Sequence, residues 1–161
     1  MLTKDELLNI LEEVKDPEIP TVSLVDLGVI FKADVDDAGA VQIEMTPTFA
    51  GCPAMRYMQH EVERVLTDKG IAHEVKVNYE KQWSSNLVTD RGRQRLKEFG
   101  LAPPPRFEGE PDLEYLLNHT NCPYCNSTHT ELRNAFGPTL CRSMHYCKDC
   151  LQMFEQFKPL G

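Results

Sequence analysis

The first apolar pattern of the chain has the period of an α-helix. Four apolar residues stand at positions i, i+3, i+4 and i+7, and this spacing predicts an amphipathic helix that ends near Lys15. Thr3 and Glu6 precede the pattern at the spacing of a capping box, in which each side chain accepts from the other residue's backbone N–H. The apolar face of this helix consists of Leu7, Ile10, Leu11 and Val14.

Apolar and polar residues then alternate in two segments, which predicts strands at residues 29–35 and 41–45. Residues 36–39 between them have the composition of a β-hairpin turn. A second helix is predicted from about Pro53 to Gly70, where glycine suits a C-terminal cap. Its apolar face consists of Met55, Met58, Val62, Val65 and Leu66.

A third strand at residues 75–79 and a short basic helix at residues 89–99 complete the first predicted domain. The resulting order, αββαβα, predicts a small two-layer α+β domain at residues 1–101, with its helices on one face of a mixed sheet. The prolines of residues 102–118 predict a stiff linker of polyproline character. A separate C-terminal module is expected at residues 119–161.

The charge of the chain limits the partners that it can bind. The 161 residues carry a formal net charge of −8, which argues against a general nucleic-acid binder or a protein held on an anionic membrane. Residues 1–118 carry 13 Lys and Arg against 22 Asp and Glu, whereas residues 119–161 carry 4 against 3. The sequence has no apolar run of membrane-spanning length and no signal-peptide pattern at its start, so we expect a cytoplasmic protein.

Six cysteines in a chain expected to be cytoplasmic indicate metal binding or reactive thiols rather than disulfides. The chain contains two C-x-x-C pairs separated by 21 residues, a spacing typical of two knuckles that hold one tetrahedral ion. We therefore expect a structural four-thiolate site in a ribbon of strands, with zinc as the default ion and iron as the alternative. The module has little core, so the ion is expected to supply folding free energy. The pairs are Cys122 with Cys125 and Cys147 with Cys150.

Other potential ligands stand near these pairs. Because four thiolates are available, the nearby histidines are not needed as ligands, and we interpret them as structural or exposed. Three roles stay open for Cys141, which is left over: a small packed residue, a fifth thiol beside the site, or an alternative ligand. A closed four-thiolate site has no open coordination position, so we expect a structural rather than a catalytic role. The nearby histidines are His119, His129 and His145.

Cys52 is the only cysteine of the first 121 residues, and its loop joins the second predicted strand to the second predicted helix. A thiol at the start of a helix faces unpaired N–H groups and the positive end of the helix dipole, which lower its pKa. Nearby carboxylates would raise the pKa, so the direction of the net shift stays open. The alternative interpretation is a small buried residue packed under the loop.

Three segments stand out as motifs: DPEIP at residues 16–20, DLG at residues 26–28 and TPTFAGCPA at residues 46–54. Together they resemble the MIP18 family, also called domain of unknown function 59, whose members are linked to iron–sulfur cluster assembly. The resemblance covers about residues 3–80 and implies that Cys52 is a cluster-binding or reactive thiol. Taken alone, the first segment is also typical of a turn where a helix stops. The motif residues implied to shape the thiol's pocket are Asp16, Glu18, Asp26 and Thr46.

With the C-terminal cysteines included, the chain resembles the family of D subunits of phenylacetyl-CoA epoxidase (ring 1,2-epoxidase) systems in bacterial phenylacetate degradation. This resemblance implies an accessory subunit of a multicomponent monooxygenase that matures a metal centre and has no catalytic activity of its own. The expected client is the reductase, which carries an iron–sulfur cluster and flavin. The expected cofactors are structural Zn²⁺ and a transient iron–sulfur cluster. The C-terminal segments that carry the resemblance are residues 122–125, 136–141, 147–150 and 154–158.

A cluster bound by this chain would need ligands from elsewhere. One thiol cannot complete a four-thiolate shell, so a bridging cluster requires a homodimer or the cysteines of a partner.

Two other functions are compatible with these residues. As a non-catalytic docking subunit, the chain would bridge oxygenase and reductase through the ribbon and its acidic face, with Cys52 merely packed. As a cysteine-dependent transferase, it would need a base beside Cys52, and neither His60 nor His73 is an identifiable partner. A zinc-ribbon nucleic-acid binder is disfavoured because the chain lacks a basic surface.

Overall fold

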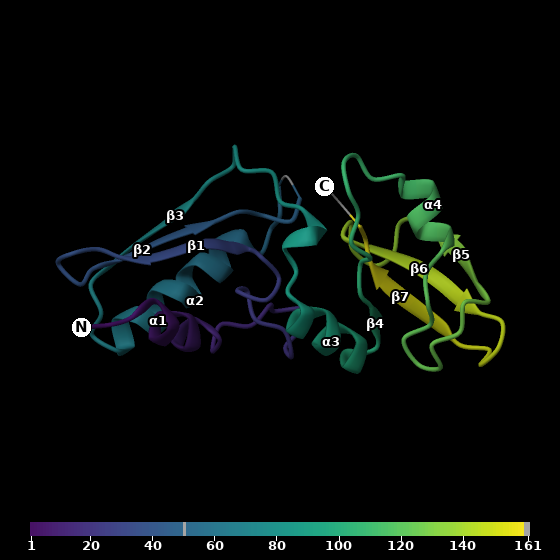
Figure 1. The fold of residues 1–161 in the computed structure, drawn as a ribbon, viewed down its shortest axis with the longest axis horizontal. Helices are drawn as coiled ribbons and strands as arrows, with labels where there is room; N and C mark the ends of the chain where they lie inside the picture. Colours follow the sequence, from purple (N-terminus) through teal and green to yellow (C-terminus); the bar gives the residue numbers. More distant parts are fainter. Residues whose placement is uncertain (50, 160–161) are drawn as a thin grey trace. The chain divides into compact units, whose positions relative to one another are not determined.

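The computed structural model of the chain describes residues 1–49 and 51–159. It divides into a first unit, Met1–Trp83, and a second unit, Ser84–Gly161, each with its own sheet (Figure 1). Within the described residues, no helix combines the length and the apolar character that crossing a membrane requires.

The first unit contains a three-stranded sheet and two helices. β1 (Ile30–Val35) pairs antiparallel with β2 (Val41–Met45), and β2 pairs in parallel with β3 (His73–Val77). The helix α2 (Met55–Asp68) forms the crossover that two parallel strands require. It lies with α1 (Lys4–Leu11) on the same face of the sheet (Figure 1). This arrangement confirms the predicted α+β class and the mixed sheet.

The core of the first unit is built from the apolar faces that the sequence predicts. All five residues of the predicted face of α2 are buried. β2 is the central strand and buries Val41, Ile43 and Met45, which are alternate positions along it. The alternation follows from the period of two in a strand, and burial of these side chains stabilises the sheet against the helices.

The first helix ends earlier than the apolar pattern predicts. α1 stops at Leu11, about one turn before the predicted end, because the N–H groups of Glu13 and Val14 bond carbonyls three residues back and tighten the chain. Val14 is still buried, so it belongs to the apolar face as predicted, although the last turn is tighter than an α-helix. The predicted capping box is present, with the N–H of Glu6 donating to the Thr3 hydroxyl over 3.2 Å.

The second unit is built on a four-stranded sheet in the order β4-β7-β6-β5. The outer strand β4 (Leu101–Ala102) is parallel to β7 (Met153–Phe157). The strand β6 (Arg142–Cys147) pairs antiparallel with both β7 and β5 (Thr130–Asn134), which gives the predicted ribbon. The helical segments of this unit are η1 (Ser85–Leu87), α3 (Asp90–Phe99) and α4 (Leu113–Asn118).

The two units divide at a different place from the predicted domains. The basic helix α3, expected in residues 1–101, belongs to the second unit, as does β4. Part of the expected linker is bound within that unit: the Asn86 amide donates to the Phe107 carbonyl over 2.8 Å and accepts from the Phe107 N–H over 3.0 Å. Another part forms α4, which Asp112 caps by accepting from the Tyr115 N–H.

Candidate functional site

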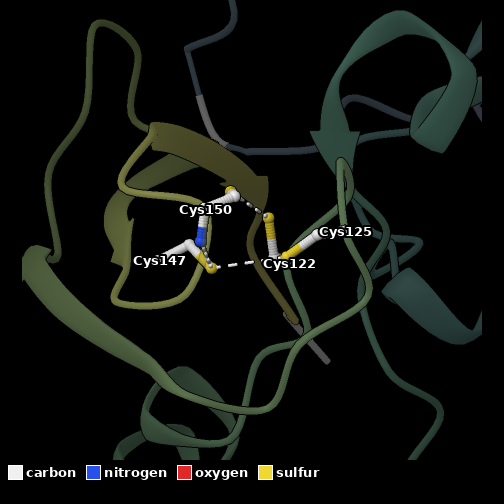
Figure 2. Close-up of side chains that lie close together, drawn as sticks. All are labelled: Cys122, Cys125, Cys147 and Cys150. Carbon is white, nitrogen blue, oxygen red and sulfur yellow. Dashed lines mark hydrogen bonds between the residues drawn. The ribbon is translucent and has the colours of Figure 1, made fainter.

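Four cysteines of the second unit meet where two knuckles of the chain come together. Cys122 and Cys125 lie in the loop between α4 and β5, Cys147 ends β6, and Cys150 lies in the turn before β7. Their four sulfur atoms all lie within 4.8 Å of one another, and Figure 2 shows the side chains converging. Across the knuckles, the sulfurs of Cys122 and Cys150 are 3.7 Å apart and those of Cys125 and Cys147 are 3.6 Å apart.

The two knuckles share one backbone geometry. In each, the N–H of the first cysteine donates to the carbonyl of the residue five positions later, over 3.0 Å at Cys122 and 2.9 Å at Cys147. The residue after the second cysteine is left-handed in each, with φ of 62° at Asn126 and 59° at Leu151. No other described non-glycine residue has a positive φ. A positive φ is unfavourable for a residue with a side chain. Its presence in both knuckles therefore indicates that the turn that orients the thiols requires it.

The sulfur positions fit one tetrahedral ion. With metal–sulfur bonds of ~2.3 Å, the edge of a regular tetrahedron is ~3.8 Å, close to the 3.6 and 3.7 Å between the knuckles. A disulfide requires ~2.05 Å between sulfurs, so all four cysteines are free thiols. Four sulfur ligands suit zinc or iron and leave no position open for a substrate.

The thiols of the cluster cannot all ionise without a cation. The N–H groups of Cys150 and Asp149 lower the pKa of Cys147 to about 7. Burial, together with hydrogen bonds to the neighbouring thiols, raises the pKa of Cys150 to about 12. A divalent cation among the four sulfurs would stabilise every thiolate at once, which is what the donor set requires.

Cys141 and the three histidines of the second unit lie outside this group of ligands in the described residues. Cys141 is buried, with its sulfur 3.0 Å from the Thr139 hydroxyl, which favours the packed role. His145 is fully buried, and burial lowers its pKa to about 4, so it is a neutral structural residue at physiological pH. The exposed histidines are His119 and His129.

Cys52 lies in the first unit, in the loop between β2 and α2. The helix begins at Met55 with Ala54 in the N-cap position, so the thiol precedes the first helical residue by three positions. The backbone N–H groups of Ala54 and Met55 still bond the sulfur and lower its pKa. Ala50, which belongs to the predicted motif, lies outside the described residues.

The net shift of the Cys52 pKa is upward. The thiol is half-buried, and burial is the main cause that raises its pKa above the ordinary value of a cysteine. The charges of Asp16 and Glu18 raise it further, and the two N–H groups do not compensate. Cys52 is therefore protonated at neutral pH. A protonated thiol is a poor nucleophile, which disfavours a cysteine-dependent transferase.

Asp16 shapes the turn that carries the acidic motif. Its Oδ1 accepts from the N–H of Glu18 over 2.7 Å and from the N–H of Ile19 over 3.1 Å. This is the turn chemistry expected where a helix stops. Because the charges of Asp16 and Glu18 also act on Cys52, the motif combines a turn with an electrostatic effect on the thiol.

Thr46 and Asp26 are both buried in the first unit. The Thr46 hydroxyl donates to the Lys81 carbonyl over 2.6 Å, and its N–H donates to the Val29 carbonyl over 2.8 Å. The hydroxyl proton of Thr46 is thus engaged in a hydrogen bond that holds the loop of Lys81. Asp26 is 1% exposed, and its N–H donates to the Ser23 hydroxyl over 3.0 Å. Of the predicted motif residues, Asp16 and Glu18 are the two whose charges shift the pKa of Cys52.

Trp83 supports the same motif, and the sequence interpretation missed it. The indole is 4% exposed, and its Nε1 donates to the Leu27 carbonyl over 2.9 Å, which fixes the turn at residues 26–28. A tryptophan in an otherwise polar loop is the available signal, because a large ring with one donor usually finds both burial and a partner.

Family models match both units. Residues 4–78 match a model described as an iron-sulfur cluster assembly protein, and residues 110–158 match one described as the PaaD zinc beta ribbon domain. The first match contains Cys52 and the acidic motif. The second contains all four clustered cysteines.

Relatives of known description extend these matches. An Escherichia coli protein described as the D subunit of 1,2-phenylacetyl-CoA epoxidase is 32% identical over 154 residues, which are 95% of this chain and 91% of that protein. An Fe-S protein maturation auxiliary factor of Porphyromonas gingivalis is 32% identical over 98 residues, 58% of this chain and 90% of that protein. The crystal structure of a domain of unknown function 59 from Bacillus anthracis covers 58% of this chain and 90% of its own, with a TM-score of 0.53 and 29% identity. The chain therefore belongs to the family of phenylacetyl-CoA epoxidase D subunits, with an iron–sulfur cluster assembly domain followed by a PaaD zinc ribbon.

Proposed function

We propose that this chain acts within a phenylacetyl-CoA epoxidase system in the assembly of an iron–sulfur cluster or other metal centre, with Cys52 as the thiol that holds the cargo. The observation that carries the proposal is the environment of Cys52. Its thiol is half-buried, accepts hydrogen bonds from two backbone N–H groups, and is subject to the negative charges of two carboxylates. It lies in the part of the chain that matches the iron–sulfur assembly family. The client that we propose is the reductase of the system, whose iron–sulfur cluster must be built.

This environment suits a temporary ligand. Burial, Asp16 and Glu18 keep the thiol of Cys52 protonated. When Fe²⁺ or a cluster takes the place of the proton, the positive charge makes the same carboxylates favourable to the thiolate instead of unfavourable. The N–H groups that bond the sulfur support the thiolate in either case. When the iron leaves, a proton returns to the thiol, so release to a client with more thiolate ligands is favoured.

The ligand shell of the cargo is completed from outside the chain. In the described residues, Cys52 belongs to no group of three or more potential ligands. A four-thiolate shell therefore needs the Cys52 of a second copy or the cysteines of the client. We propose that a homodimer, or the complex with the reductase, supplies them.

The four clustered cysteines have a separate role in this proposal. Their spacing suits a tetrahedral ion, and we propose that Cys122, Cys125, Cys147 and Cys150 bind structural Zn²⁺. Zinc would hold the two knuckles together and stabilise the sheet that they join. The second unit then serves as a rigid element for docking to the other components, and takes no part in chemistry.

The proposal is tested by the cluster content of the reductase in living cells. A strain that lacks this chain is complemented with the wild type, with Cys52→Ala, or with the matched control Cys141→Ala, which removes the other thiol outside the cluster. We expect iron and sulfide per purified reductase to fall with Cys52→Ala and to stay at the wild-type level with Cys141→Ala. A fully loaded reductase in the Cys52→Ala strain, with the variant folded and abundant, contradicts the proposal.

A non-catalytic docking subunit is the second candidate. It is favoured by the protonated state of Cys52, which is also what a merely packed thiol would have. Co-purification with the oxygenase and reductase separates the two candidates. For a docking subunit, binding survives Cys52→Ala, is lost in Cys122→Ser, and the reductase is fully loaded throughout.

A further inference from the structure

β3 leaves one edge of the first sheet without a neighbouring strand. It pairs with β2 along one side, and no described strand lies along the other (Figure 1). The side chains on its inner face are only partly buried, whereas those of the central strand β2 are buried. An uncovered edge presents a row of unpaired N–H and C=O groups, with which another strand can pair.

The direction of the backbone groups along this edge follows from the bonds to β2. The Asn78 N–H donates to the Met45 carbonyl on β2 over 2.8 Å. Because backbone groups alternate sides along a strand, those of the even-numbered residues point toward β2 and those of the odd-numbered residues point away. The Val75 carbonyl agrees with this direction, since it accepts from Gln59 Nε2 of α2 over 3.3 Å. A carbonyl oxygen has two lone pairs, so Val75 is still able to accept from another strand.

The opposite edge of the sheet, β1, differs from β3 in its regularity. The register of β1 with β2 shifts between Ile30 and Lys32, which marks a β-bulge. A bulge bends an edge strand and interrupts the row of groups that a second chain would use. The register of β3 with β2 runs from His73 to Val77 without a shift. β3 is therefore the edge of this sheet that keeps a regular row of backbone groups.

The charges of β3 identify its partner as a second copy of the same strand. Glu74 and Lys76 are exposed on one face of β3, where Lys76 Nζ lies 3.2 Å from a carboxylate oxygen of Glu74. Val75 stands between them. When two copies pair antiparallel about Val75, Glu74 of each copy stands opposite Lys76 of the partner subunit. Opposite charges at directly opposed positions stabilise a pair of strands.

The same two charges disfavour the other antiparallel registers. A shift by two residues places Glu74 opposite Glu74, or Lys76 opposite Lys76, and like charges at opposed positions are destabilising. A shift by one residue turns the charged face of one copy to the helix-covered side of the combined sheet. In the register about Val75, the outward N–H and C=O groups of the two copies point at one another. The hydrogen bonds and the charges therefore favour one register.

We propose that two copies of this chain associate through β3, antiparallel about Val75, and form one continuous sheet across the dimer. Pairing removes the partly exposed side chains of Val75 and Val77 from water, which adds to the hydrogen bonds. The contact consists of a strand of 5 residues from each copy, so the dimer dissociates on dilution. This association does not depend on Cys52 and goes beyond the proposed function.

The geometry of this dimer has a consequence for the ligands of the cargo. β2 and β3 are parallel, so the loop that contains Cys52 follows β2 at the Val77 end of β3. The two-fold axis at Val75 places the same loop of the partner subunit at the opposite end of the paired strands. A second copy bound through β3 therefore does not bring its thiol to the same cluster. This step rests on the proposed function, and it assigns the remaining ligands to the client.

The oligomeric state of the full-length zinc-loaded protein, prepared without iron, tests the dimer. Sedimentation equilibrium is measured from micromolar to millimolar concentration, and we expect a monomer–dimer equilibrium. Glu74→Lys and Lys76→Glu each set like charges opposite one another, so each should raise the dissociation constant about tenfold or more. Asp37→Lys, an exposed change in the hairpin turn with the same charge difference as Glu74→Lys, is the matched control and should dimerise as the wild type does.

Recombining the charges tests the register itself. In an equimolar mixture of Glu74→Lys and Lys76→Glu, opposite charges meet again, so we expect a dimer that contains one copy of each. The double variant has the net charge of the wild type and should dimerise like it. The proposal is overturned if the wild type stays monomeric at millimolar concentration, if the single variants dimerise as the wild type does, or if their mixture stays monomeric.

Hydrogen exchange gives a further test that needs no variant. In the dimer, the outward N–H groups of β3 are bonded to the partner subunit, so their exchange in the wild type should slow as the concentration rises, while exchange in β1 stays the same. Protection of β3 that requires the reductase would assign the edge to the client and overturn the dimer. Because every measurement uses protein without iron, failure of the dimer leaves the role proposed for Cys52 standing.

Discussion

Cys147 and Cys52 each receive hydrogen bonds from two backbone N–H groups, yet their pKa values move in opposite directions. The pKa of Cys147 is lowered to about 7, whereas that of Cys52 is raised. Hydrogen bonds between Cys147 and the neighbouring thiols lower its pKa further, while Cys52 faces the charges of Asp16 and Glu18. Backbone donors at a sulfur therefore do not by themselves make a thiolate: burial and nearby charge decide the outcome.

The four clustered cysteines and Cys52 also differ in the number of sulfur ligands that they bring together. The cluster of the second unit has four ligands within 4.8 Å of one another and no place for a further one. A complete ligand set of this kind favours permanent binding. In the function that we propose, the thiol of Cys52 is a single ligand that keeps its proton until a metal replaces it. An incomplete set favours exchange, which is what a protein that passes metal to a client needs.

Removal of the metal is expected to have the largest effect and to act on one unit alone. Structural zinc in small peptides binds with about 10–16 kcal/mol, so chelation should unfold the knuckles and the sheet of the second unit. The ¹H–¹⁵N signals of α2 and β2 should remain dispersed, since the first unit has its own core. Cys147→Ser should behave like the chelated protein and Cys141→Ser like the wild type. Collapse of both sets of signals would show that the units fold as one.

A cavity created by mutation in the core of the first unit should have the next largest effect, and this effect should be confined to that unit. Leu66 is fully buried on α2, so Leu66→Ala is expected to lower the free energy of unfolding of the first unit by about 2–5 kcal/mol. Trp83, the only tryptophan, is buried in that unit and reports its urea unfolding by fluorescence. Tyr57→Ala, at an exposed position of the same helix, should cost about 0.5 kcal/mol or less. Loss of zinc from Leu66→Ala would contradict independent units.

The carboxylate effect on Cys52 should be smaller but has a definite sign. Glu18 raises the pKa of the thiol, so Glu18→Gln should lower it. At a pH below the pKa of the thiol, more thiolate is then present and alkylation of Cys52 by iodoacetamide is faster, by up to about tenfold. Mass spectrometry of the Cys52 peptide across pH 7–10 measures this, with Glu80→Gln as a control of equal charge change. Unchanged or slower alkylation would show that the Glu18 carboxylate does not raise the pKa of Cys52.

The sequence predicted most helices and strands of the first unit, because the spacing of apolar residues within each element is sufficient to identify it. The apolar face of α2 and the alternation in β2 are read directly from residue spacing, and both match the buried residues. The early end of α1 was not predictable, because Val14 fills an apolar position whether the last turn is α-helical or tighter. The division into units after Trp83 also has no local signal in the sequence. The pairing of Leu101 with Glu155 joins distant residues and leaves no local pattern.

The candidate sites show the same limit. The spacing of two C-x-x-C pairs predicted the thiol cluster, since that spacing is itself a geometric constraint. The pKa direction of Cys52 could not be predicted, because it depends on burial and on distances to Asp16 and Glu18.

Our main proposal is that Cys52 carries iron while the four clustered cysteines do not exchange their ion. It is tested most directly by iron bound per chain after anaerobic reconstitution of the zinc-loaded protein with Fe²⁺ and sulfide. Metal analysis and absorbance are read on the wild type, Cys52→Ala and Cys141→Ala. We expect unchanged zinc in all three, and iron in the wild type and Cys141→Ala but not in Cys52→Ala. Equal iron in the wild type and Cys52→Ala would contradict it.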